Sequence, residues 1–122
     1  MTYNWSGKKI LIVEDNGINC LLFEHILRET DLDFNFARSS KDFFNLINNT
    51  YDLILMDINI GEDISGIDLI EYMLINDIDI PVIIQSALDD NSLDIDSIKH
   101  IDIIRKPINI NEFLLKLNDV LK

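Results

Sequence analysis

The chain has 122 residues, 48% of them hydrophobic and 26% charged, a composition typical of one globular domain with its own core. Its formal net charge of -12 argues against direct nucleic-acid binding, because phosphate contacts need clustered lysine and arginine. The single cysteine, Cys20, excludes an internal disulfide framework, and no apolar run approaches the ~20 residues of a membrane helix. We therefore expect a cytoplasmic protein with no membrane partner, and a single domain over residues 1–122 whose core spans about 8–121.

Five short apolar runs, which alternate with amphipathic segments, predict strands. In chain order the strands are expected at residues 10–13, 33–39, 52–57, 80–87 and 101–107. The amphipathic segments predict helices at residues 16–30, 41–49, 67–77, 91–100 and 109–122. The fourth of these helices is expected to be short, because its segment holds few strong helix formers. This alternation favours an α/β fold, in which a parallel sheet carries helices on both faces.

Two of the helices carry more specific predictions. The apolar residues of the first helix recur at helical spacing and are expected to form its buried face: Ile18, Leu21, Leu22, Ile26 and Leu27. Ser40 is a candidate N-cap for the second helix, because a serine hydroxyl can accept a hydrogen bond from a backbone N–H of the first turn.

Polar and charged residues stand where the predicted strands end. They are Glu14 and Asp15 after the first strand, Asp57 at the third, Ser86 at the fourth and Lys106 at the fifth. Because ligands of open parallel sheets bind beyond the carboxyl ends of the strands, these side chains are expected to meet at one edge. Taken singly, each has an ordinary explanation, such as a solvated turn or a helix start. Their shared position at the ends of different strands favours a functional site.

The residue types at that edge suit phosphoryl chemistry with a metal ion. Three carboxylates brought together repel one another and lose hydration, so a positive charge must compensate. Oxygen ligands without histidine or cysteine favour Mg²⁺. Asp57 could act as a nucleophile towards phosphorus, while Lys106 supplies a charge and Ser86 a hydroxyl donor for a phosphate.

The stretches ILIVEDN, DLILMDI, IIQSA and IRKP closely resemble the receiver domain of two-component response regulators, in the expected order and over nearly the whole chain. The resemblance implies a flavodoxin-like fold, with a five-stranded parallel sheet in the order 2-1-3-4-5. It implies that Asp57 accepts a phosphoryl group and that Ser86 and Lys106 bind that group. It also implies that the Lys106–Pro107 peptide bond is cis.

The same resemblance implies a cofactor and a partner. Mg²⁺ would be held by Glu14, Asp15, Asp57 and the backbone carbonyl of Asn59. The phosphoryl donor would be the phosphohistidine of a histidine kinase or a histidine phosphotransfer protein, in a phosphorelay that signals by conformational change. Such a domain is not an enzyme in the usual sense, because it catalyses only its own phosphorylation and dephosphorylation. A dimer that forms on phosphorylation is a further expectation. The stretch EDNGIN looks like receivers attached to hybrid histidine kinases. Its Asn19 either caps or satisfies backbone near the site or faces solvent, and the second alternative is favoured.

The chain departs from the family's common pattern at several places. Ile60 and Gly61 stand where Met-Pro is common, and the loop NIGEDISG is one residue longer. Ile103 stands where many receivers carry a tyrosine or phenylalanine that rotates inward on activation. The segment between Ser86 and Lys106 is also short by comparison. The resemblance therefore does not carry the usual switch, which links Ser86 to that aromatic residue, over to this chain.

Two alternative functions stay open. One is a docking module on the same fold that works without phosphorylation. The other, less favoured, is a Mg²⁺-dependent phosphohydrolase with an aspartyl-phosphate intermediate. Such enzymes usually show Asp-x-Asp at the nucleophile, whereas Asp57 is followed here by Ile58 and Asn59.

Overall fold

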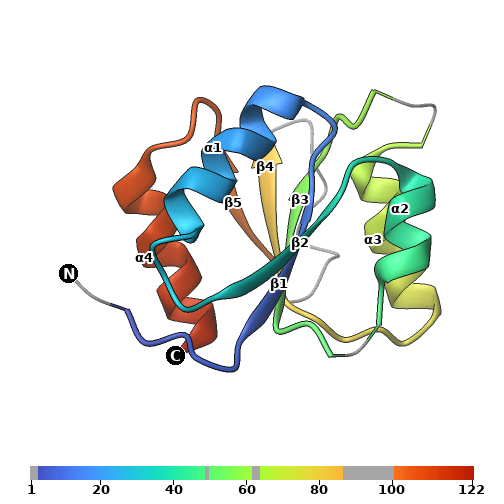
Figure 1. The fold of residues 1–122 in the computed structure, drawn as a ribbon. Helices are drawn as coiled ribbons and strands as arrows, with labels where there is room; N and C mark the ends of the chain where they lie inside the picture. The colour runs from blue at the N-terminus through green and yellow to red at the C-terminus, as the bar shows by residue number, and fades with distance from the viewer. Residues whose placement is uncertain (1–2, 49, 62–63, 87–100) are drawn as a thin grey trace.

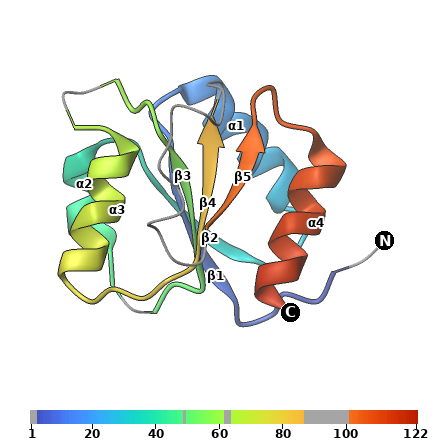
Figure 2. The same cartoon turned by 180° about the vertical axis from the view of Figure 1, so that it is seen from behind.

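The computed structural model describes residues 3–48, 50–61, 64–86 and 101–122, whose arrangement is shown in Figures 1 and 2. The described elements are, in chain order, β1 (Lys9–Val13), α1 (Gly17–Leu27), β2 (Asp33–Ala37), α2 (Ser40–Leu46), β3 (Leu53–Asp57), α3 (Gly66–Ile75), β4 (Val82–Ser86), β5 (Ile101–Arg105) and α4 (Ile110–Leu121). The helix expected at residues 91–100 lies outside the described residues. None of the described helices is both long and apolar enough to cross a bilayer.

The strands form one parallel sheet in the order β2-β1-β3-β4-β5. The helices α1 and α4 cover one face of this sheet, and α2 and α3 cover the other (Figures 1 and 2). The predicted flavodoxin-like fold and strand order are therefore confirmed. The order reverses between β1 and β3, which is where ligands bind in folds of this kind.

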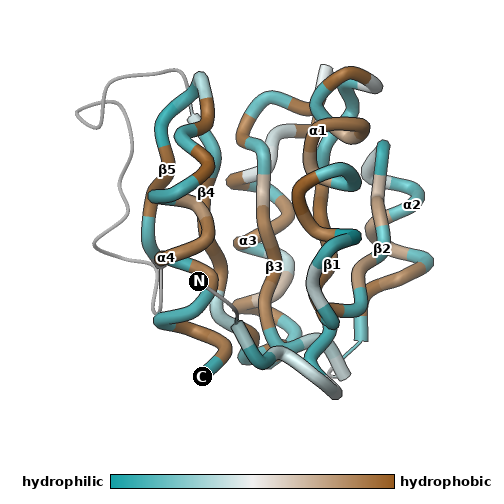
Figure 3. The backbone as a smooth tube through the Cα atoms, turned by 60° about the vertical axis from the view of Figure 1, so that its left-hand side comes forward, coloured by the Kyte–Doolittle hydropathy of each residue, from teal (hydrophilic) through white to brown (hydrophobic). Residues whose placement is uncertain are grey.

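The core consists of two buried clusters, because successive residues of a strand point to opposite faces of the sheet. Leu53 and Leu55 pack in the cluster under α1 and α4, together with Phe113. Ile54 and Met56 pack in the cluster under α2 and α3. We call these sides the α1/α4 face and the α2/α3 face. Figure 3 shows the hydrophobic stretches of the central strands between the helical layers.

Side-chain caps mark the starts of the helices, and one of them differs from the prediction. The Asn16 side chain caps α1 by accepting hydrogen bonds from the backbone N–H groups of Ile18 and Asn19, at 2.9 and 3.1 Å. At α2 the cap is Ser39, whose hydroxyl accepts from the backbone N–H of Asp42 at 3.1 Å. The prediction of Ser40 was wrong because an N-cap needs extended backbone, which Ser39 has, whereas Ser40 is already helical.

The buried stripe of α1 agrees with the prediction in part: Leu27 is buried and Ile26 is partly buried, whereas Leu22 is exposed. The side chains that face the sheet are Cys20, Phe23 and Leu27. Ile18 and Leu21, which were expected to be buried, are 78% and 66% exposed. Both sets recur at helical spacing, and the helix buries the side that carries Phe23. Phe23 packs against Phe113 of α4, with ring centroids 5.3 Å apart.

The segment before β1 is part of the packed domain. Trp5 is fully buried in the cluster of the α1/α4 face and stacks on Tyr3, with ring centroids 4.8 Å apart. Its indole N–H donates to Asn118 Oδ1 at 3.2 Å, and its backbone N–H donates to Asp31 Oδ1 at 2.8 Å. The first bond ties the N-terminal segment to α4, and the second ties it to the loop between α1 and β2.

Candidate functional site

Glu14 and Asp57 lie on the same face of the sheet, at the ends of neighbouring strands. Ile12 of β1 pairs with Leu55 of β3, and both belong to the cluster of the α1/α4 face. Glu14 and Asp57 stand two residues further along each strand, so their side chains point to that face as well. Glu14 is fully buried and Asp57 is 3% exposed. Together with Asp15, they offer carboxylate oxygens that all lie within 4.8 Å of one another.

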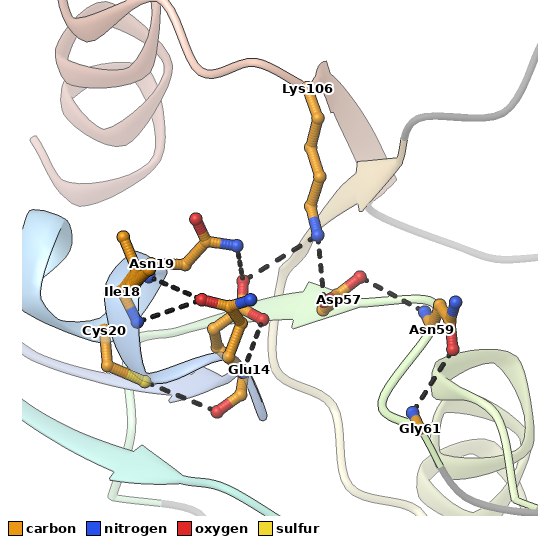
Figure 4. A network of polar contacts seen from close by, with 9 residues as sticks. Glu14, Ile18, Asn19, Cys20, Asp57, Asn59, Gly61 and Lys106 are labelled. Atoms are coloured by element: carbon orange, nitrogen blue, oxygen red, sulfur yellow. Dashed lines mark hydrogen bonds and ion pairs between the residues drawn. The ribbon is translucent and has the colours of Figure 1, made fainter.

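Lys106 brings a positive charge to these carboxylates. Its ammonium nitrogen donates to Asp57 Oδ2 at 2.9 Å and lies 3.8 Å from Glu14 Oε1 (Figure 4). The backbone N–H of Lys106 donates to the carbonyl of Ser86 at 3.0 Å, which holds the residue that follows β5 against the end of β4. The Lys106–Pro107 bond is cis, as predicted.

The environment of Glu14 favours its neutral form. The pKa of this carboxyl is raised from 4.5 to about 7, first of all by burial and then by a hydrogen bond with Asp57 and by the negative charge of Asp57. Two groups act in the opposite direction: the backbone N–H of Asn16, which donates to Glu14 Oε2 at 3.2 Å, and the ammonium of Lys106.

Asn19 also contacts this carboxylate, which the sequence did not indicate. Its side-chain N–H donates to Glu14 Oε1 at 3.3 Å (Figure 4). The expectation that Asn19 faces solvent was therefore wrong. The start of α1 at Gly17 turns Asn19 back towards the end of β1, and this geometry depends on the helix start and not on residue type.

The loop after β3 orients Asp57. The backbone N–H of Asn59 donates to Asp57 Oδ1 at 3.1 Å, and the Asn59 side chain in turn accepts from the backbone N–H of Gly61 at 3.2 Å (Figure 4). Gly61 has φ +70°, and a Cβ at this position would lie 2.6 Å from Asp15 Oδ2. Gly61, one of the two residues that stand where Met-Pro is common, therefore allows the loop to approach Asp15 closely.

A cavity of about 380 Å³ joins the residues that were predicted from the sequence. They line it together: Glu14, Asp15, Asp57, Asn59, Ser86 and Lys106. Gln85 lines the same cavity and was not predicted to do so. The donors of the carboxylate group are oxygens only, without histidine or cysteine among them, which suits Mg²⁺.

Gly66 lies against the backbone of Asp57, so that the first turn of α3 packs closely on the end of β3. A Cβ at Gly66 would lie 2.3 Å from the carbonyl oxygen of Asp57. We expect Gly66→Ala to lower the free energy of unfolding by about 1–3 kcal/mol, since backbone must move to accept the methyl group. Gly17→Ala is the matched control. It also stands at the first position of a helix, but its Cβ would meet only the end of the flexible Arg38 side chain, at 3.2 Å. Urea unfolding of both variants measures the difference, and equal losses would contradict the packing argument.

The comparison with protein families gives one match that covers most of the chain. The model of the response regulator receiver domain matches residues 10–118. A search of curated proteins gives no match.

Solved structures with a similar fold include several receiver domains. The receiver domain of the Francisella response regulator 1452 is 28% identical, covers 93% of this chain and 96% of its own, and has a TM-score of 0.79. The non-phosphorylated HemR receiver domain from Leptospira biflexa is 25% identical over 94% of each chain, with a TM-score of 0.83. A CheY-like receiver domain protein from Methanospirillum hungatei shares the fold at 24% identity, with 95% of this chain and 94% of its own covered and a TM-score of 0.82. Since the family match spans most of its length, the chain belongs to the response regulator receiver domain family.

Proposed function

We propose that this receiver domain accepts a phosphoryl group on Asp57 from the phosphohistidine of a histidine kinase or a histidine phosphotransfer protein. The observation that carries the proposal is the meeting of Asp57 with two further carboxylates and with Lys106, whose ammonium lies 2.9 Å from Asp57 Oδ2. One cavity is thus lined by a candidate nucleophile, by a group of oxygens that suits a metal and by a cation for phosphoryl oxygens.

In the proposed reaction, an oxygen of the ionised Asp57 carboxylate attacks the phosphorus atom. An O–P bond forms and the P–N bond to the donor imidazole breaks. The electron pair returns to the ring nitrogen, which takes up a proton from solvent, and the product is an aspartyl phosphate. The Asn59 backbone N–H on Asp57 Oδ1 fixes the carboxylate, while Lys106 and the Ser86 hydroxyl would bind phosphoryl oxygens.

The metal would be held by Glu14, Asp15, Asp57 and the Asn59 carbonyl. When bound, Mg²⁺ would neutralise negative charge on the phosphoryl oxygens. Asp15 reaches this group from the turn between β1 and α1, where the Arg38 side chain donates to its backbone carbonyl at 3.2 Å.

The loop after Asp57 favours a signalling domain that is modified once over a hydrolase that turns over. A second acid two residues after the nucleophile would serve a hydrolase, but Asn59 stands there. Its side-chain oxygen accepts from the Gly61 backbone N–H and holds the loop.

Ile103, which is partly buried in the cluster of the α2/α3 face, is an aliphatic residue that cannot repeat an aromatic switch. We therefore infer that any signal passes through another contact.

The test is phosphorylation of the wild-type chain by a small phosphodonor such as acetyl phosphate. With Mg²⁺ present, the intact mass is expected to rise by one phosphoryl group, and with EDTA it is expected to stay unchanged. A wild-type chain that gains no mass with Mg²⁺, or gains as much with EDTA, would overturn the proposal. Continued release of phosphate from small phosphomonoesters would favour the hydrolase instead.

A further inference from the structure

Gln85 has a buried side-chain amide with no hydrogen-bond partner among the residues that the structure describes. The residue is fully buried, and neither Oε1 nor Nε2 bonds to any group in the part of the chain that the structure describes. Native proteins leave few such groups, because a buried amide loses its bonds to water and needs replacements. An unpaired amide therefore points to a partner that is added in another state of the molecule.

The position of Gln85 in the sheet places it beside the proposed phosphoacceptor. Gln85 of β4 pairs in register with Asp57 of β3. Two residues earlier on each strand, Ile83 pairs with Leu55, and both belong to the cluster of the α1/α4 face. Asp57 and Gln85 therefore extend from the same face of adjacent strands, which lie about 4.8 Å apart in a sheet. A glutamine side chain is long enough to span that separation.

If position 85 had only a packing role, an apolar residue would suit it. The neighbours of Gln85 on the same face are Ile83 along β4 and Ile104 across on β5, both buried and apolar. The cavity that Gln85 lines is, by contrast, the one that holds the carboxylates and Lys106. The amide is thus explained by the cavity and not by the core.

We propose that the Gln85 amide is a further binding residue for the phosphoryl group, with Nε2 donating a hydrogen bond to a phosphoryl oxygen on Asp57. This inference rests on the proposed function. A neutral donor adds a bond to the anion without another charge, in a site where Lys106 is already shared between Asp57 and Glu14. Within the described residues the amide has no partner before modification, and it would gain one after modification. Gln85 would therefore favour the phosphorylated state twice, because it destabilises the unmodified domain and stabilises the modified one.

The experiment compares wild type with Gln85→Met, which keeps the length of the side chain and removes the amide, and with Gln85→Leu as a second apolar variant. Ile83→Met is the matched control, because Ile83 is buried on the same face and the same strand. The probe is beryllofluoride with Mg²⁺, a phosphoryl mimic, titrated by ¹⁹F NMR. Thermal unfolding of each unliganded variant is measured in parallel.

We expect the Gln85 variants to unfold a few degrees higher than wild type and to bind beryllofluoride about tenfold more weakly, the effect of one hydrogen bond to a charged group. Ile83→Met is expected to change the affinity by less than about twofold. Unchanged affinity in the Gln85 variants would overturn the inference. So would a joint fall in stability and affinity, which would assign the amide to a bond within the unmodified domain, such as one to a buried water.

The wild-type titration separates this inference from the proposed function. If wild type binds beryllofluoride and Asp57→Asn does not, the phosphoacceptor stands whatever Gln85 does. If wild type fails to bind, or binds no better than Asp57→Asn, the proposed function fails and the role of Gln85 fails with it.

Discussion

Asp57→Asn is expected to abolish phosphorylation, with a loss of at least about a thousandfold in the rate of modification by acetyl phosphate and Mg²⁺. Asparagine has nearly the same shape and can still accept the hydrogen bond that the Asn59 backbone N–H gives to Oδ1. It lacks the negative carboxylate that attacks phosphorus and that Lys106 contacts at 2.9 Å. The variant should therefore fold, as circular dichroism can check, while its intact mass stays unchanged.

Asp33→Asn is the matched control for this substitution. Asp33 is an exposed aspartate at the first position of β2, at the opposite end of the strands from the cavity. The Asp33→Asn substitution removes one negative charge from the chain without touching the site, so the modification rate of this variant should equal that of wild type. A mass gain of one phosphoryl group in Asp57→Asn would show that another residue is the acceptor.

Much of the fold could be predicted because the strands are buried on both faces. A run such as Leu53 to Met56 is apolar throughout, and this pattern distinguishes a central parallel strand from an amphipathic helix. Alternation of strand and helix then limits the connections to crossovers of one hand, which brings the carboxyl ends of the strands to one edge. The meeting of Glu14, Asp57 and Lys106 follows from that topology and not from details of packing.

The details that the sequence did not predict depend on contacts across elements. In α1, apolar residues recur at helical spacing on more than one side, and the buried side is the one on which Phe23 packs against Phe113 of α4. The role of Asn19 depends on where α1 begins, which patterns place only to within a few residues. Gln85 did give a signal: it is a polar residue in phase with Ile83 within an otherwise apolar strand. Whether such a residue has a partner cannot be judged without the neighbouring strands.

Glu14 is expected to make the stability of the metal-free domain depend on pH, with the domain less stable at higher pH. The pKa of Glu14 is 4.5 in its unperturbed form and about 7 in the folded domain, where burial and Asp57 disfavour its charge. Between these values the folded chain holds a proton that the unfolded chain has released. Because the folded state binds more protons, the free energy of unfolding falls as the pH rises through this window. The stabilisation is full below pH 4.5 and is lost above the folded pKa, with a total change of about 3 kcal/mol.

Glu14→Gln should remove this dependence, since glutamine fills the same volume and stays neutral. Urea unfolding in EDTA, repeated across the window, is expected to show that the free energy of unfolding of wild type falls as the pH rises. The contribution of this position to that fall should be absent in the variant. At the alkaline end Glu14→Gln should then be the more stable protein, because it buries no charge beside Asp57. Glu24→Gln is the control: Glu24 is exposed on α1, and its substitution should leave the slope of wild type intact. If Glu14→Gln and wild type lose stability in parallel, the titrating group lies elsewhere. The expected difference would mean that the domain keeps its carboxylates together near neutral pH at the expense of its own stability, which is the condition that a cation at this site would relieve.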